Sequence, residues 1–107
     1  MSSSKSYLEY VLEQLSGLGD VSYQSMMGEY ILYYRGRIFG GIYDDRLLVK
    51  DTPSARRLMP EAPMELPYPG AKEMLLVEEL DDRAFLEKLL REMAKELPAG
   101  KSASKSR

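Results

Sequence analysis

The stretch YILYYRGRIFGGIYDDRLLVK, residues 30–50, decides how this chain folds. It contains three apolar runs, separated by Arg35-Gly36 and by Asp44-Asp45. A two-residue loop between apolar runs predicts a tight β-hairpin, so the stretch is expected to form a three-strand antiparallel meander. Its central run contains Gly40-Gly41, and glycine inside a strand is typical of a place where another group approaches closely.

Two tight loops would also set the strand register. Leu32 is then expected opposite Phe39, and Tyr30 opposite Gly41. Because side chains alternate between the two faces of a strand, this register assigns each side chain of the meander to one face of the sheet. One face is nearly aliphatic and is expected to form the core under the helices, with Ile31, Tyr33, Ile38, Gly40, Ile42, Leu47 and Val49.

The opposite face of the meander is expected to be an aromatic face, formed by Tyr30, Tyr34, Arg37, Phe39 and Tyr43. Tyrosine is enriched at interfaces, so these five residues are the candidate partner-binding site. Three alternatives remain open at this point. Residues 60–70 could cover the face internally, a second copy could cover it in a homodimer, or single-stranded nucleic acid could stack on its rings.

The glycine pair allows two interpretations as well. Gly40 could make room for a helix on the core face, while the ring of Tyr30 covers Gly41 across the strands. Alternatively, Gly41 could be the floor of a shallow pocket walled by Tyr30, Leu48 and Tyr43. That alternative predicts a small-ligand-binding or sensor module.

The rest of the chain predicts helices at both ends of the sheet. Leu8, Val11, Leu12 and Leu15 have helical spacing, with Ser6 or Ser4 as the start. Residues 21–26 are a candidate strand, and a short helix follows Thr52-Pro53. Residues 60–70 contain four prolines and predict a stiff loop or edge segment, and residues 74–77 predict a strand buried on both sides.

The last helix is expected to begin at Asp81 and to present a leucine-rich face before Pro98. Glu78, Glu79, Asp81 and Asp82 surround its start, and this position favours a role at the helix terminus over a metal site. The fold class is therefore α+β, an antiparallel meander sheet packed with N-terminal and C-terminal helices. We expect one domain over residues 1–97 and a disordered basic tail over residues 98–107.

Composition excludes several classes of function. Among its 107 residues the chain has no His and no Cys, which removes the usual ligands of zinc, copper and haem and the common nucleophile–base pairs. No enzyme activity, cofactor or metal is therefore expected. Residues 1–97 hold 12 basic and 17 acidic side chains, a net charge of 12 − 17 = −5, which argues against direct nucleic-acid binding. The sequence has no membrane-spanning run or signal peptide, so a cytoplasmic location is expected.

The chain contains three motifs in a distinctive order: Met26-Met27-Gly28-Glu29-Tyr30, Leu32-Tyr33-Tyr34-Arg35-Gly36-Arg37, and Ile42-Tyr43-Asp44-Asp45-Arg46-Leu47-Leu48-Val49-Lys50. In these motifs, and over about residues 5–97, the chain resembles the N-terminal domain of the TfoX/Sxy proteins, which regulate natural competence in bacteria. The resemblance implies an α+β domain without catalytic residues. It also implies a bacterial accessory regulator of transcription that acts through a protein partner, with the cyclic-AMP receptor protein as the candidate. Full regulators carry a second helical domain, so this chain is expected to be a stand-alone N-terminal domain.

Overall fold

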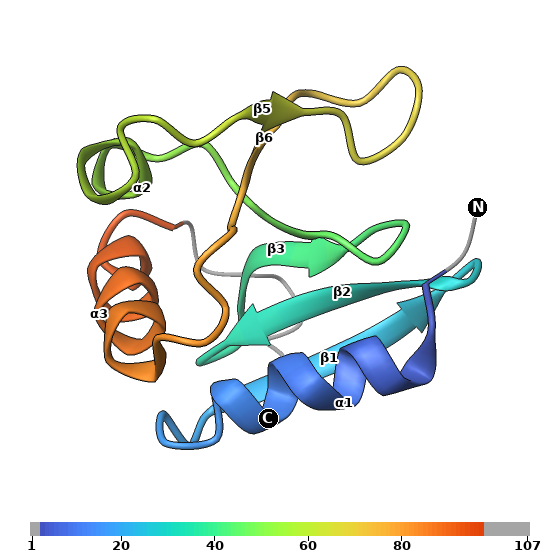
Figure 1. The fold of residues 1–107 in the computed structure, drawn as a ribbon, viewed down its shortest axis with the longest axis horizontal. Helices are drawn as coiled ribbons and strands as arrows, with labels where there is room; N and C mark the ends of the chain where they lie inside the picture. Colours follow the sequence, from blue (N-terminus) through green and yellow to red (C-terminus); the bar gives the residue numbers. More distant parts are fainter. Residues whose placement is uncertain (1–2, 98–107) are drawn as a thin grey trace.

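The computed structural model describes residues 3–97, which form one antiparallel sheet with helices packed against it (Figure 1). The sheet order is β1-β2-β3-β4-β6-β5, and each neighbouring pair is antiparallel. The α+β class is confirmed. In chain order the elements are α1 (Lys5–Gln14), β1 (Val21–Met26), β2 (Glu29–Tyr34), β3 (Arg37–Ile42), β4 (Leu47–Val49), α2 (Pro53–Leu58), β5 (Met64–Glu65), β6 (Met74–Leu76) and α3 (Arg83–Ala94).

Both hairpin loops of the meander form as expected. Arg35 and Gly36 have φ values of 55° and 77°, and Asp44 and Asp45 have values of 56° and 55°. Two consecutive residues in the left-handed region match the right-handed twist of the flanking strands, which is why such loops close hairpins. The loops therefore connect β2 to β3 and β3 to β4 directly.

The expected register fails at a β-bulge in β3. Tyr33 pairs with Ile38 and Leu32 pairs with Gly40, so Phe39 is an extra residue with no partner on β2. The predicted pairing of Leu32 with Phe39 is wrong. A bulge of this kind inserts one residue into a single strand and shifts everything beyond it by one position.

This shift reverses the predicted faces of β2. Tyr30 pairs with Ile42 instead of Gly41, and the residues predicted to form the core on β2 and early β3, Ile31, Tyr33 and Ile38, are only half-buried. A shift of one residue moves every side chain to the other face. The residues of β2, β3 and β4 that join the core cluster are Leu32, Tyr34, Phe39, Ile42, Leu47 and Val49.

Helices α1 and α3 supply the other side of this core. The buried residues Leu8, Val11 and Leu15 come from the first helix and its end, and α3 supplies Leu86, Leu89, Leu90 and Met93. The side chain of Ser4 caps α1, and Thr52 caps α2 as predicted. Helix α3 begins one residue later than expected, because Asp82 rather than Asp81 accepts the cap hydrogen bond, from the Phe85 main chain at 3.0 Å.

The proline-rich segment is a loop with a short edge strand, as predicted. Its two strand residues form β5, which pairs with β6, and β6 pairs in turn with β4. Of the three residues of β6, only Leu75 is buried, so the expectation of burial on both sides is wrong. In Figure 1 this segment lies at the top of the molecule, opposite α1 and β1.

Two further sequence predictions concern the C-terminal tail and membrane-spanning helices. The predicted disordered tail, residues 98–107, lies outside the described residues. Within residues 3–97, none of the helices combines the length and the apolar character needed to cross a bilayer.

Candidate functional site: an apolar groove beside two hairpin turns

Exposed apolar side chains gather at one end of the molecule. Within residues 3–97 six large hydrophobic side chains are exposed, and four of them line a single groove with a volume of about 690 Å³. These four are Met27 (94% exposed), Tyr68 (55%), Leu66 (46%) and Met26 (44%). We call this hollow the apolar groove; it is lined by Met26, Met27, Glu29, Tyr43, Asp44, Arg46, Leu66, Pro67, Tyr68 and Pro69.

The first wall of the apolar groove is the turn between β1 and β2. Met27 and Gly28 are its two loop residues, with φ values of 53° and 85°. Asparagine, aspartate and glycine are the usual residues in this left-handed conformation, and an apolar side chain there carries backbone strain. Met27 thus combines an unfavourable backbone with an almost fully exposed thioether side chain, and no packing within residues 3–97 offsets either cost.

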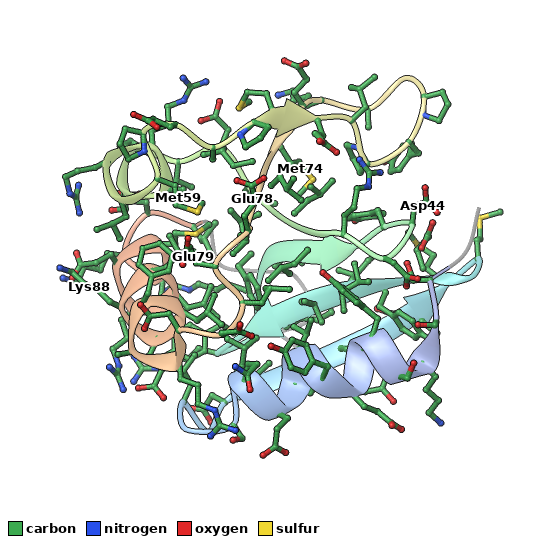
Figure 2. The ribbon with its side chains drawn as sticks, viewed as in Figure 1. Asp44, Met59, Met74, Glu78, Glu79 and Lys88 are labelled. Carbon is green, nitrogen blue, oxygen red and sulfur yellow. The ribbon has the colours of Figure 1, made fainter. Side chains whose placement is uncertain are left out.

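The start of the chain holds this wall in place. Ser3 donates a main-chain hydrogen bond to the Gly28 carbonyl at 2.9 Å, and its hydroxyl donates to a carboxylate oxygen of Glu29 at 2.6 Å. The main-chain N–H of Asp44 donates to the same Glu29 oxygen at 3.1 Å, and that of Asp45 donates to the Ser3 hydroxyl at 3.0 Å. These bonds join two hairpin turns, and Figure 2 shows Asp44 at the resulting end of the molecule.

Arg46 fixes the opposite wall. Its guanidinium donates to the carbonyl of Tyr43 at 3.0 Å and to the carbonyl of Leu66 at 3.2 Å, and it forms an ion pair with Glu65. The group therefore ties the β3–β4 turn to the segment Leu66–Pro69. Two prolines stiffen that segment further, because each fixes its own φ angle.

Tyr43 lies in the lining between the two walls. It is only 8% exposed, and its ring centroid is 6.2 Å from that of Tyr68. Burial raises the pKa of the Tyr43 hydroxyl above its ordinary value, and Tyr68 and Glu29 act in the same direction. The phenol is therefore neutral throughout the physiological pH range, and it contributes surface and a hydrogen-bonding group rather than charge.

The ring of Tyr43 also explains why position 41 is a glycine. An added Cβ at Gly41 would lie 2.6 Å from both the Tyr43 ring and the Tyr30 carbonyl oxygen. The glycine is thus required for close approach, as predicted, but the covering ring comes from Tyr43 and not from Tyr30. Because that ring covers it, Gly41 does not line the apolar groove, and the predicted pocket floor is wrong.

The five residues of the predicted aromatic face do not share a surface. Tyr34 and Phe39 are 3% and 1% exposed and belong to the core. Arg37 is half-buried and donates to the carbonyls of Ala94 and Leu97 at 2.7 and 3.2 Å. The expectation of one exposed face is wrong, because the one-residue shift at the bulge places Tyr34 and its face of β2 against the core.

The two remaining members of that face lie in different surroundings. Tyr30 is half-buried and meets the ring of Tyr23 edge to face, with centroids 5.8 Å apart. Of the five residues of the predicted aromatic face, Tyr43 is the one that lines the apolar groove. Sequence reasoning missed the other lining residues, although a Met-Met pair ahead of Gly28 was a signal, because methionine at a turn has no core to fill. A partner contact through the five residues stays a prediction.

The charge at the apolar groove is mainly negative. Glu29 and Asp44 line it, and its single lining cation, Arg46, is paired with Glu65. Elsewhere, Asp81 accepts a hydrogen bond from Tyr10 of α1, and Asp82 caps α3, so one member of the acidic cluster of the sequence acts at the helix start. Among the described residues, no group of three acidic side chains is arranged to hold a metal ion.

Comparison with known proteins places the chain in a family. The model of the TfoX N-terminal domain matches residues 13–94. The chain belongs to the TfoX N-terminal domain family. This family is associated with competence regulation, and the resemblance seen in the sequence is confirmed.

A curated relative of this TfoX-type domain comes from Spirochaeta aurantia. It is described as an uncharacterized 12.7 kDa protein in the trpE 5′ region, and it is 33% identical over 102 residues. The alignment covers 94% of this chain and 89% of the relative. No solved structure matches the chain.

Proposed function

We propose that this TfoX-type domain is a non-enzymatic protein-interaction domain that docks a partner in the apolar groove. Its role is that of an accessory regulator of transcription, in the competence setting with which the family is associated. By resemblance, the candidate partner is the cyclic-AMP receptor protein. The residues that we assign to the contact are Met26, Met27, Tyr43, Leu66 and Tyr68.

The observation that carries this proposal is Met27, a strained turn residue whose apolar side chain is 94% exposed. Backbone strain of this kind persists where a function repays it. Methionine adapts its shape to different partners, and Tyr68 offers a large rigid ring beside it. Contiguous exposed apolar surface of this kind marks interaction sites in soluble proteins.

The negative charge at the apolar groove indicates that the partner carries basic side chains there. Glu29 and Asp44 give one wall a negative potential, and the Arg46 charge is balanced by Glu65. A complementary segment therefore combines apolar side chains with lysine or arginine at its margin. Such complementarity steers association and selects among partners.

An NMR titration of the isotope-labelled protein with the cyclic-AMP receptor protein of its host tests the proposal. We expect amide shifts at residues 26–29, 43–46 and 66–69, with and without promoter DNA. A spectrum that stays unchanged at receptor concentrations near 100 µM would exclude this partner.

Paired substitutions locate the contact. Met27→Ser together with Tyr68→Ser should raise the Kd at least about tenfold, because apolar and aromatic anchors dominate such interfaces. Both side chains are exposed, so thermal stability should change little. The matched control is Tyr10→Ser, an exposed tyrosine outside the groove, which should bind as the wild type does.

A small apolar ligand in the same groove is the second candidate function. The volume of about 690 Å³ and the lining by tyrosine, proline and methionine match small-molecule sites. A thermal-shift screen of nucleotides and metabolites tests it, since a ligand at 100 times its Kd stabilises the fold by about 2.7 kcal/mol. A hit that Tyr68→Ser abolishes would favour the ligand over the protein partner.

A further inference from the structure

Strand β1 is an open edge of the sheet. It occupies one outer position, and its six residues, Val-Ser-Tyr-Gln-Ser-Met, include neither a charge nor a proline. Five of these six side chains are exposed. Proteins normally protect an edge strand by shortness, proline or charge, because its free main-chain groups pair with other strands.

The opposite edge shows that protection. Strand β5 has only two residues, one of which is Glu65, and it lies in a segment with prolines at positions 60, 63, 67 and 69. One edge of the same sheet is therefore blocked and the other is not. This contrast indicates that β1 is kept free for pairing.

The hydrogen-bond direction along β1 follows from its turn. In a two-residue hairpin loop the residues on either side exchange two main-chain hydrogen bonds. Tyr43 and Arg46 show this pattern across their own loop, at 2.9 and 3.1 Å. Met26 and Glu29 flank the equivalent loop between β1 and β2.

From Met26 backward, every second residue of β1 turns its main-chain groups toward β2. Beyond the strand, the Asp20 carbonyl accepts from the Arg35 N–H at 2.9 Å, which fits this alternation. The N–H and C=O groups that point away from the sheet therefore belong to Val21, Tyr23 and Ser25. No hydrogen bond within residues 3–97 joins these outward groups to a side chain.

We propose that β1 pairs antiparallel with β1 of a second copy of this chain, with a two-fold axis at Tyr23. In this register Val21 lies opposite Ser25 of the second copy, and the two Tyr23 residues face each other. The outward groups of both strands then exchange about six main-chain hydrogen bonds. The two sheets become one continuous sheet.

A second copy fits this edge because the strand is complementary to itself. A two-fold pairing places identical regions together, so charged side chains on β1 would repel one another, and β1 has none. Ser22 lies opposite Gln24 of the second copy. The Gln24 carbonyl oxygen already accepts from the Tyr33 hydroxyl at 2.9 Å, which leaves its amide N–H groups to donate to that serine.

The surface beside the strand also offers room for the second tyrosine. A hollow of about 390 Å³ lies between the end of α1 and β1, lined by Leu12, Leu15, Ser16, Gly19, Val21, Ser22 and Tyr23. Tyr23 is 44% exposed. The ring of the second Tyr23 covers this hollow and stacks against its counterpart, and such aromatic cross-strand pairs stabilise antiparallel sheets.

Sedimentation analysis of the full chain tests the proposal directly. At about 100 µM the wild type should have twice the 12.2 kDa mass of one chain, falling to the monomer mass on dilution. Ser25→Pro removes an outward N–H while leaving the bonds to β2, and proline is tolerated on that side of an edge strand. It should weaken dimerisation at least tenfold, whereas the matched Ser25→Ala should dimerise normally.

A charge-exchange pair tests the two-fold axis itself. Tyr23→Lys alone and Tyr23→Glu alone should each be monomeric, because like charges face each other across the axis. An equimolar mixture should recover the dimer mass. A monomeric wild type, a dimer that survives Ser25→Pro, or a mixture that stays monomeric would each overturn the proposal.

The groove variants separate this inference from the proposed function. Met27→Ser with Tyr68→Ser should leave the dimer mass unchanged, because neither side chain belongs to the outward edge. Conversely, a failed partner titration with an intact dimer would refute the docking function alone. Loss of the dimer in the groove variant would place the self-contact at the groove and refute the β1 pairing.

Discussion

At the scale of single residues, the two central glycines are required by different neighbours. The three nearest neighbours of a Cβ at Gly40 are all main-chain atoms: it would collide with the main chain of Leu48 and lie 2.8 Å from the Val49 Cα. At Gly41 a Cβ would lie 2.6 Å from both the Tyr30 carbonyl oxygen and the Tyr43 ring. Main-chain atoms of a paired strand cannot move aside without breaking the ladder. Both glycines therefore resist replacement, and Gly40 does so more strongly because a Cβ there meets main-chain atoms alone and more closely.

We expect Gly40→Ala to lower the free energy of unfolding by about 1–3 kcal/mol, the usual cost of forcing extra volume into a packed site. Urea denaturation followed by circular dichroism measures it. Gly17→Ala is the control, because its Cβ meets only the flexible carboxylate of Glu87, which can move away. Equal losses in both variants would contradict the steric argument.

Glu96 gives the fold a pH-dependent contact. It accepts hydrogen bonds from the Ser54 main chain at 3.0 Å and from the Ser54 hydroxyl at 2.7 Å, and these bonds hold its pKa below the ordinary value of 4.5. A lowered folded pKa stabilises the protein at pH values above the unfolded pKa. That contribution disappears as the pH falls through the folded value.

Glu96→Gln should therefore lower the Tm at pH 7, and the difference from wild type should shrink as the pH falls below 4.5. The reason is that protonation removes the charge-assisted bonds in the wild type as well. Thermal melts between pH 7 and pH 3 measure this. Glu73→Gln, at an exposed position, should show no such convergence, and a constant difference for Glu96→Gln would exclude the linkage.

At the scale of elements, Arg37 links the sheet to the end of α3. Its guanidinium donates to the carbonyl of Ala94, one of the groups that the end of α3 leaves unpaired, and to the carbonyl of Leu97 beyond the helix. Arg37→Met keeps the aliphatic stem and removes these donors. It should cost about 1–3 kcal/mol of unfolding free energy, the usual cost of leaving partly buried acceptors without a partner.

The control for this substitution is Arg35→Met, one loop residue away. Arg35 is largely exposed, lies over the Tyr34 ring at 5.5 Å, and is 3.9 Å from Asp20. Exposed contacts of this kind contribute well under 1 kcal/mol in most measurements. Chemical denaturation of both variants decides the matter, and a larger loss for Arg35→Met would show that Arg37 does not hold α3.

The elements of the meander could be predicted from sequence, but their faces could not. The loops at Arg35-Gly36 and Asp44-Asp45 have a local cause, because few residue pairs suit left-handed turns. The bulge at Phe39 has no such local signature, since it forms where a large ring gains burial in the core. Gly40-Gly41 indicated an irregular position in the strand, but the pair did not indicate that Phe39 would be the extra residue of a bulge.

The same limit applies to the candidate site. Tyr43 was named from the sequence because it belongs to a hairpin with predictable geometry. Met27 and Tyr68 are 41 positions apart, and only the folded chain brings them to one groove. The wall that contains Tyr68 is held by the Arg46 side chain, and the sequence pattern does not reveal its three acceptors on Tyr43, Glu65 and Leu66.

At the scale of the whole molecule, the apolar groove and the β1 edge meet at Met26. This residue ends β1 and also lines the groove. In the proposed two-fold pairing the two copies of Met26 lie at opposite ends of the joined strands, about 20 Å apart at the usual strand rise. The dimer therefore presents two symmetric grooves, an arrangement suited to a partner that is itself two-fold symmetric.

Self-association through β1 also predicts a stability that depends on protein concentration. Because dimerisation stabilises only the folded state, mass action raises the Tm as the concentration rises. For a domain of about 100 residues we expect roughly 3–6 °C for each tenfold increase above the dimer Kd. Calorimetric scans from about 10 to 1000 µM measure the slope. Ser25→Ala should retain it, and in Ser25→Pro the rise in Tm should begin only at concentrations at least about tenfold higher. A wild-type Tm that does not change with concentration would contradict a dimer in this range, whatever partner the groove binds.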